Sequence, residues 1–198
     1  MAKLYFIYAA MNAGKSTALL QSAFNYHERG MRTILLTPAV NQRDGKGVIT
    51  SRLGLAEPAI IFAPDTDLER MIMSAGDESD NTQSIDCVLI DEAQFLTRAQ
   101  VRALTTIVDI HNIPVMCYGL RTDFRGRLFE GSEALFALAD QLKEMKSICH
   151  CGRKATMNLR INDDGLAVTS GNKIEIGGNE RYIPLCRKHF YERLEADA

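Results

Sequence analysis

Four apolar runs without polar alternation constrain the fold of this chain more than any other feature. They lie at residues 4–9, 33–37, 87–91 and 115–120, and residues 59–62 form a shorter candidate. Such runs are typical of strands covered on both faces, as in parallel sheets. Residues 15–29, 68–74 and 97–111 lie between them and have helical patterns. The alternation predicts an α/β fold, a parallel sheet flanked by helices.

The remaining segments depart from this alternation. Residues 41–52 are polar and contain glycine, which predicts a loop, and residues 121–129 carry Arg121, Arg125 and Arg127 directly after a strand. From about residue 141 the character changes. A hairpin is expected from 155–161, through a turn at 163–165, to 173–178, followed by a terminal helix from 186. We therefore expect two domains, 1–142 and 143–198.

The composition disfavours some classes of protein. The net charge of −2, with 46% hydrophobic and 24% charged residues, is ordinary for a globular protein. A dedicated nucleic-acid binder usually carries a basic excess, so we expect no nucleic-acid partner. Five cysteines, an odd count, indicate a reducing compartment. No segment has the length of a membrane span, and we expect a cytoplasmic protein without a membrane partner.

A phosphate-binding loop is predicted where the first apolar run meets the first helical pattern. The loop comprises Ala9, Ala10, Met11, Asn12, Ala13, Gly14, Lys15 and Ser16. The pattern G-x-x-x-x-G-K-[ST] combines backbone N–H groups that cradle phosphates, a lysine that reaches the terminal phosphates and a hydroxyl for Mg²⁺. Ala9 stands at the first glycine position. A chance Gly-Lys-Ser is the alternative, but its place between strand and helix favours ATP binding.

The end of the run at 87–91 supplies two adjacent carboxylates, Asp91 and Glu92. Asp91 is expected to hold Mg²⁺ together with Ser16. Glu92 could orient a water for hydrolysis or take a proton from a substrate hydroxyl. The alternative is a pair of acidic residues that favours a helix start. A GTPase is disfavoured because Gln94 occupies the position of the switch glycine.

Two short ligand pairs lie on either side of the expected hairpin. Cys149, Cys151, Cys186 and His189 would complete a tetrahedral structural zinc site. Three reduced thiols with an incidental histidine are one alternative, and His150 in place of one cysteine is another. Thiolate-rich, closed coordination indicates a role in folding and not in catalysis.

Several motifs together resemble the type II thymidine kinases, the cytosolic thymidine kinase class of bacteria and animals, and look close to the enterobacterial type. They are AMNAGKST (10–17), DEAQFL (91–96), YGLRTDFRG (118–126), the CHCG and CRKH pairs, and IGGNERY (176–182). They occur in the family's order over nearly the whole chain. The resemblance implies a RecA-like P-loop domain, a small zinc-binding lasso domain, and transfer of phosphate from Mg-ATP to the 5′-hydroxyl of thymidine or deoxyuridine in nucleotide salvage.

The resemblance also implies roles for single residues. ATP is assigned to 9–16 with Asp91, Glu92, Ala93 and Gln94, and Glu92 is the general base. The nucleoside is assigned to Met11, Phe95, Leu120, Phe124, Phe129, Lys173, Ile174, Glu175, Ile176, Gly177 and Tyr182. Core packing is the alternative for the phenylalanines. The arginines at 121–127 could contact phosphate or a carboxylate, or form a solvated surface.

Family members are homotetramers inhibited by thymidine triphosphate, and both properties are expectations here. Three departures from the family's pattern stand out: Ala9, the C-x-C spacing at Cys149, and the charged Lys173 and Glu175 where a more apolar strand would fit. Two other readings stay open: a zinc-ribbon P-loop ATPase that acts on nucleic acid, and a nucleotide-binding module without turnover.

Overall fold

A parallel sheet forms the centre of the molecule. The computed structural model describes residues 1–40, 47–77, 84–171 and 181–196. The sheet has the order β5-β2-β6-β7-β1-β8, and every pair in it is parallel. Its strands are β1 (Leu4–Ala9), β2 (Thr33–Pro38), β5 (Ile60–Phe62), β6 (Cys87–Ile90), β7 (Val115–Leu120) and β8 (Gln141–Glu144).

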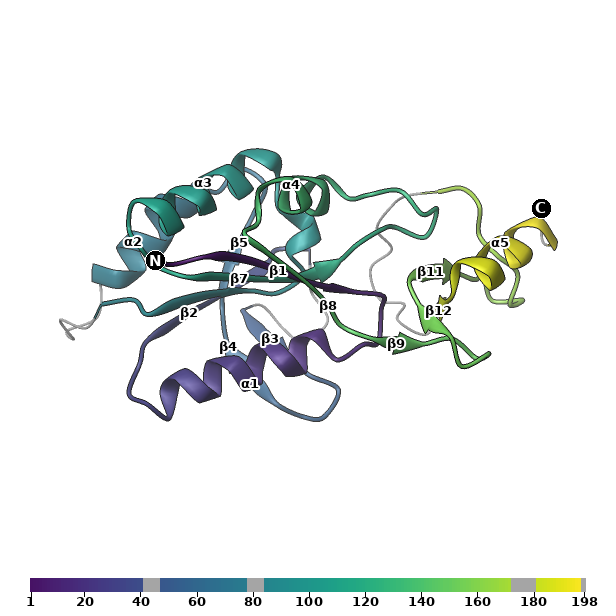
Figure 1. Cartoon of the computed structure of the whole chain (residues 1–198), viewed down its shortest axis with the longest axis horizontal. Helices are drawn as coiled ribbons and strands as arrows, with labels where there is room; N and C mark the ends of the chain where they lie inside the picture. The colour runs from purple at the N-terminus through teal and green to yellow at the C-terminus, as the bar shows by residue number, and fades with distance from the viewer. Residues whose placement is uncertain (41–46, 78–83, 172–180, 197–198) are drawn as a thin grey trace.

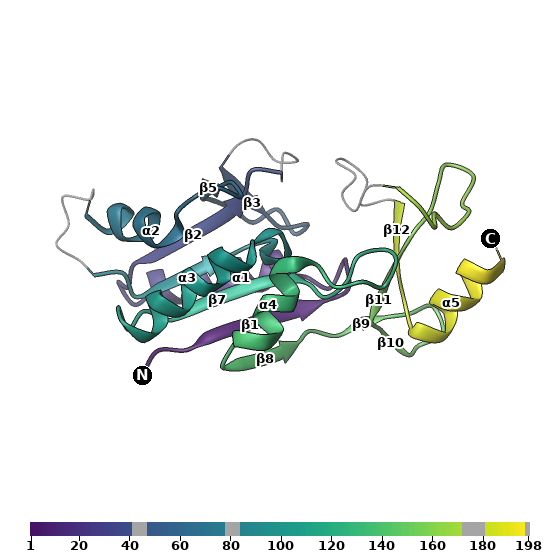
Figure 2. The same ribbon diagram turned by 90° about the horizontal axis from the view of Figure 1, so that it is seen from above.

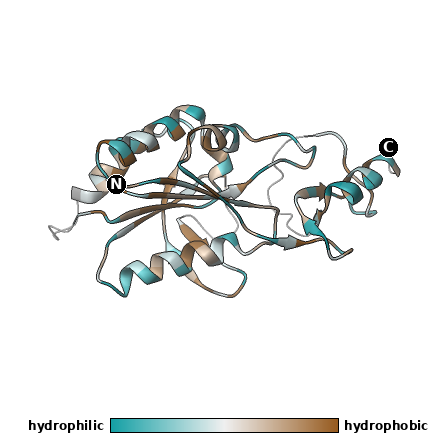
Figure 3. Cartoon of the chain, in the orientation of Figure 1, coloured by the Kyte–Doolittle hydropathy of each residue, from teal (hydrophilic) through white to brown (hydrophobic). Residues whose placement is uncertain are grey.

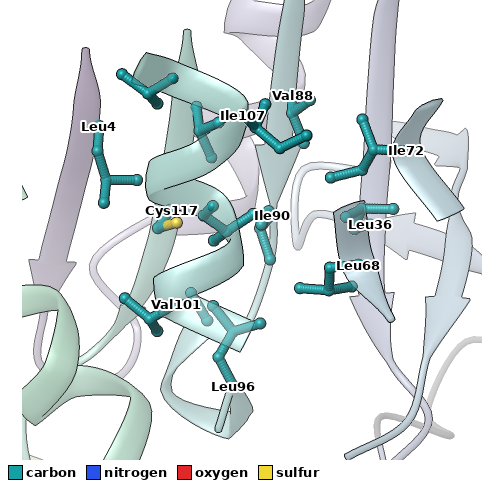
Figure 4. Close-up of a cluster of buried hydrophobic side chains, with 14 of the residues drawn as sticks. Leu4, Leu36, Leu68, Ile72, Val88, Ile90, Leu96, Val101, Ile107 and Cys117 are labelled. Carbon is teal, nitrogen blue, oxygen red and sulfur yellow. The ribbon is translucent and has the colours of Figure 1, made fainter. Parts of the chain in front are cut away.

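Helices cover both faces of this sheet (Figure 1). On one face lie α2 (Leu68–Asp77), α3 (Arg98–Asp109) and α4 (Glu130–Leu138), and on the other lies α1 (Lys15–His27). Leu36, Val88 and Ile90 of the strands pack against Val101 and Ile107 of α3 in the larger core (Figure 4). The hydropathy colouring in Figure 3 shows the strands as the apolar interior between more polar helices. The expected α/β fold class is thereby confirmed.

A smaller unit follows the sheet at the end toward which β1 runs (Figures 1 and 2). It contains β9 (Ser147–Ile148), β10 (Lys154–Ala155), β11 (Met157–Arg160), β12 (Tyr182–Leu185) and α5 (Arg187–Ala196). Leu159, Leu185 and Phe190 are buried in its own core beside Cys149 and Cys186. The terminal helix was predicted correctly, and so was the turn at 163–165, where the Gly165 N–H donates to Asn162 O over 3.0 Å.

One detail differs from the sequence expectations. Val48–Thr50, within the segment expected as a loop, forms β3 and pairs in a hairpin with β4 (Ala56–Pro58). Ile49 packs against α1, but two adjacent apolar residues among polar ones, Val48 and Ile49, show no detectable period. The partner of β11 is β12, whereas the expected return strand at 173–178 lies outside the described residues. The division into two domains, 1–142 and 143–198, stays a prediction; residue 143 lies in β8, which pairs with β1 of the central sheet. Among the described residues, no helix is long and apolar enough to cross a membrane.

Candidate active site and metal centre

The predicted phosphate loop and the predicted carboxylates meet at one edge of the sheet. Because β1, β6 and β7 are parallel, their carboxyl ends lie at the same edge. Ala9 is level with Leu120 in the β1–β7 ladder, and Ile90, which precedes Asp91, is level with Cys117. This edge faces the small unit (Figures 1 and 2). The candidate site therefore lies between the sheet and the C-terminal part of the chain.

The loop after β1 has the backbone of a phosphate cradle. Asn12 and Gly14 both have left-handed backbone angles, with φ of 63° and 80°, and α1 begins directly after Gly14. Lys15 is buried, and its Nζ donates to Ala10 O over 3.0 Å. Burial lowers the pKa of Lys15, while the charges of Glu92 and Asp91 oppose that shift. The arrangement places a helix amino terminus and a lysine ammonium together, as an anion site requires.

Ser16 and Asp91 form the candidate Mg²⁺ site. The Ser16 hydroxyl donates to Asp91 Oδ2 over 3.1 Å. Burial, and then the charge of Glu92, raise the pKa of Asp91 to about 7, although the Ser16 hydrogen bond works in the opposite direction. A buried carboxylate and a hydroxyl are hard oxygen ligands of the kind Mg²⁺ takes. These two residues fit the ion.

Gln94 fixes the side chain of Glu92. The Gln94 Nε2 group donates to Glu92 Oε2, and Gln94 Oε1 accepts from Leu120 N over 2.9 Å. Gln94 is only 2% exposed, whereas Glu92 is partly exposed and has a left-handed backbone with φ of 48°. A non-glycine residue in this conformation is uncommon and is often found at functional sites. Gln94 thus connects the loop after β6 to the end of β7.

Two glycines provide the space for this connection. A Cβ on Gly119 would lie 3.0 Å from Gln94 Oε1 and 3.1 Å from Gln94 N. A Cβ on Gly131, in the first turn of α4, would lie 2.6 Å from Ala93 O. The short helix η1 (Ala93–Phe95) is therefore packed closely between β7 and α4, which holds Glu92 at the sheet edge.

The arginine-rich loop at 121–129 is closed by Asp123. Asp123 is buried, and its Oδ1 accepts from the backbone N–H groups of Arg125 and Arg127, each over 2.9 Å. Phe124 is fully buried, with the Arg160 guanidinium 4.0 Å from its ring centroid. Arg121 donates to Thr156 O over 3.1 Å. The sequence left open whether these arginines contact a carboxylate or form a solvated surface. Arg125 pairs with the Asp123 carboxylate at 3.6 Å, whereas Arg127 is exposed.

The other residues predicted for a nucleoside are only partly brought together. Phe95 and Phe129 make an edge-to-face pair with centroids 5.9 Å apart; Phe129 is buried, while Phe95 is partly exposed. Leu120 lies at the end of β7, and Tyr182 pairs with Arg160 between β12 and β11. Lys173, Ile174, Glu175, Ile176 and Gly177 lie outside the described residues.

The predicted cysteine–histidine cluster forms in the small unit. The ligand atoms of Cys149, Cys151, Cys186 and His189 all lie within 4.8 Å of one another. Cys151 Sγ is 3.9 Å from Cys186 Sγ, and His189 Nδ1 is 3.3 Å from Cys149 Sγ. A tetrahedron with metal–sulfur bonds of about 2.3 Å has edges of about 3.8 Å, so the four residues fit Zn²⁺.

Within the cluster, Cys149 is favoured as a thiolate. Burial works against ionisation of Cys149, but hydrogen bonds from the backbone N–H groups of Cys151 and Cys186 and from His189 together lower its pKa to about 6. All five cysteines lie in the described residues, and none is in a disulfide. His150 stacks on His189 with centroids 4.3 Å apart, beside the four clustered residues.

Comparison with known proteins decides the family. The profile of the thymidine kinase family matches residues 2–190. The chain is 58% identical to a thymidine kinase of Novosphingobium aromaticivorans, covering 98% of this chain and 99% of the relative. It is 57% identical to one of Xanthomonas axonopodis pv. citri and 55% identical to one of Salmonella typhimurium, each of which is covered to 93%. The chain belongs to the thymidine kinase family.

The structure of this thymidine kinase family member adds to the candidate site one residue that the sequence did not indicate. Asn158, on β11, is buried and accepts a hydrogen bond from Met11 N in the phosphate loop over 2.7 Å. The two residues are 147 positions apart, and no sequence motif around Asn158 predicts such a partner.

Proposed function

We propose that this thymidine kinase family member is an ATP:thymidine 5′-phosphotransferase, converting thymidine and deoxyuridine to their 5′-monophosphates. The observation that carries the proposal is the Glu92 carboxylate, held by Gln94 beside the phosphate loop. A free alcohol is a weak nucleophile, so its phosphorylation benefits from a carboxylate base at this place.

In the proposed reaction, the Glu92 carboxylate takes the proton of the 5′-hydroxyl. The 5′-oxygen then forms a bond to the γ-phosphorus of ATP, and the bond from that phosphorus to the β,γ-bridging oxygen breaks, releasing ADP. Lys15 and the N–H groups of residues 12–16 stabilise the phosphate charge, since phosphoryl transfer depends mainly on positioning and electrostatics. Mg²⁺, held by Ser16 and Asp91, would supply further positive charge at the β- and γ-phosphates.

The nucleoside is proposed to bind between the sheet edge and the small unit. Phe95, whose side chain is partly exposed and packs edge-to-face on Phe129 at the start of α4, is proposed to line this site. Met11, Leu120, Phe124, Tyr182 and the stretch 173–177 are proposed to complete the pocket. The Cys₃His cluster is proposed to hold a structural Zn²⁺ that folds the small unit.

Three further properties are part of the proposal. The chain is proposed to form a homotetramer in the cytoplasm and to be inhibited by thymidine triphosphate. Light scattering of the purified protein measures the first property, and inhibition curves at fixed thymidine measure the last. A monomer at micromolar concentration, or activity insensitive to thymidine triphosphate, would contradict the respective statement.

The test of the function is thymidine-dependent release of ADP from Mg-ATP. Controls contain deoxycytidine, deoxyadenosine or no nucleoside. Release with thymidine and deoxyuridine alone is expected. Release without any nucleoside would instead favour an ATPase, and no release would favour a binding module.

Glu92→Gln tests the role of the base. Loss of a general base typically costs about 10²–10⁴-fold in rate. We expect kcat to fall by that amount, while the Kd for ADP stays within about twofold, because the phosphate loop is unchanged. Retained turnover in Glu92→Gln would remove Glu92 from its assigned role.

A further inference from the structure

Strand β11 has two chemically different sides. Met157 and Leu159 point into the core of the small unit with Leu185 and Phe190. Asn158 and Arg160 alternate with them and contact the rest of the molecule: Asn158 reaches two loops at the sheet edge, and Arg160 lies over Phe124. Side chains alternate in this way along any strand. Through its second side, β11 is a direct link between the small unit and the candidate site.

Asn158 makes two hydrogen bonds, to two different loops. Its Oδ1 accepts from Met11 N over 2.7 Å, and its Nδ2 donates to Thr122 O over 3.2 Å. Met11 belongs to the phosphate loop after β1, and Thr122 to the loop after β7. Asn158 therefore bridges the loop proposed for ATP and a loop proposed for the nucleoside.

The chemistry of the partners explains why an amide suits this position. Met11 N–H is a donor and Thr122 C=O is an acceptor, so only one orientation of the amide satisfies both. Asn158 is only 2% exposed, and a buried polar group without its partner is costly. Met11 directly precedes Asn12, whose φ is 63°, so the first bond holds the chain at the entrance to the left-handed turn of the cradle.

We propose that Asn158 is a positioning residue that holds the phosphate loop and the 121–129 loop in register with each other before either substrate binds. This inference rests on the proposed function. The loops then lose less conformational freedom when ATP and the nucleoside bind. Because β11 pairs with β12, which leads directly into Cys186, folding of the small unit sets both loops at once.

Two variants separate the two hydrogen bonds. Asn158→Leu has similar volume and removes both. Asn158→Asp, measured at pH 8, keeps an oxygen that accepts from Met11 N–H but replaces the N–H donor that reaches Thr122. Leu159→Val is the matched control: it lies on the same strand and is fully buried, but faces the core of the small unit.

The readouts are the Kd for ADP from titration calorimetry, the KM for thymidine, kcat, and the melting temperature. For Asn158→Leu we expect the Kd for ADP and the KM for thymidine each to rise about three- to tenfold, the range of one lost hydrogen bond. The kcat should stay within about threefold. For Asn158→Asp we expect an ADP Kd near that of the natural chain and a raised KM for thymidine. Leu159→Val should lower the melting temperature and leave both constants unchanged.

Other outcomes overturn the inference. An Asn158→Leu protein that binds ADP like the natural chain would show that the bond to Met11 does not position the loop. An equal rise of both constants in Leu159→Val would show that only the stability of the small unit matters. If the natural chain itself bound no ADP, the proposed function would fall, and with it the basis of this inference.

Discussion

Replacing Gln94 by leucine would keep Glu92 in the chain but remove the side chain that orients its carboxylate. Leucine resembles glutamine in size but can neither donate to Glu92 nor accept from Leu120 N–H. The Glu92 carboxylate keeps its place in the sequence and loses the group that orients it. Leu120 N–H, which is bonded over 2.9 Å in the natural chain, is left without that partner.

The size of the effect follows from these two bonds. A hydrogen bond to a charged group contributes about 1.5–3 kcal/mol, and a fully buried unpaired N–H costs about 1–3 kcal/mol, with the part-buried Leu120 N–H at the lower end. Allowing for the apolar burial gained, we expect the free energy of unfolding to fall by about 2–4 kcal/mol. For a chain of this length that is a decrease of roughly 4–16 °C in melting temperature. Misplacement of Glu92 by about 1 Å would lower kcat by about 10²-fold.

Gln100→Leu is the matched control. Gln100 is also buried and uses its amide within the chain, donating to Ala63 O over 2.8 Å and accepting from Thr97 N over 3.1 Å, but it does not contact Glu92. Thermal unfolding should show similar destabilisation for both variants, whereas steady-state assays should show a lowered kcat for Gln94→Leu alone. A folded Gln94→Leu protein with kcat within about threefold of the natural chain would refute the positioning of Glu92 by Gln94.

Three further predictions concern the metal sites and the packing. The folded pKa of Asp91 is about 7, above its ordinary value of 3.8, so the ion-free protein should lose stability as pH rises between these values. Since Mg²⁺ competes with the proton, its contribution to ADP affinity should rise about tenfold from pH 6 to pH 8 in calorimetry; a flat profile would contradict the shift. Elemental analysis should find one Zn²⁺ per chain. The Cys186→Ser variant should lose this ion, and its small unit should unfold, which limited proteolysis would detect as new cleavage sites C-terminal to residue 145. Retained zinc in this variant would exclude Cys186 as a ligand. Denaturant titrations should show that Gly131→Ala lowers the free energy of unfolding by about 1–3 kcal/mol, because the new alanine Cβ would lie 2.6 Å from Ala93 O. Unchanged stability would mean that α4 shifts to make room for this Cβ.

The residues expected to carry the chemistry of the candidate site can be predicted from short patterns in the sequence. Lys15 and Ser16 after a strand, Asp91 and Glu92 after another, and the spaced cysteines with His189 are short patterns, and short patterns are readable because the atoms they bring together are near in the chain. Parallel strands then place their carboxyl ends at one edge, so the meeting of the first two patterns also follows from the sequence. The structure confirms this meeting in the Ser16–Asp91 hydrogen bond.

How these groups are held, in contrast, depends on contacts between segments that are distant in the chain. Gln94 belongs to the motif at 91–96, yet its side-chain Oε1 accepts a hydrogen bond from Leu120 N, 26 positions away. Asn158 contacts Met11 across 147 positions, and β11 pairs with β12. Contacts of this kind depend on which segments pack side by side, and hydrophobic periodicity reports only which face of each segment is buried. The sequence therefore predicts which groups carry the chemistry, and the packing of distant segments determines their orientation.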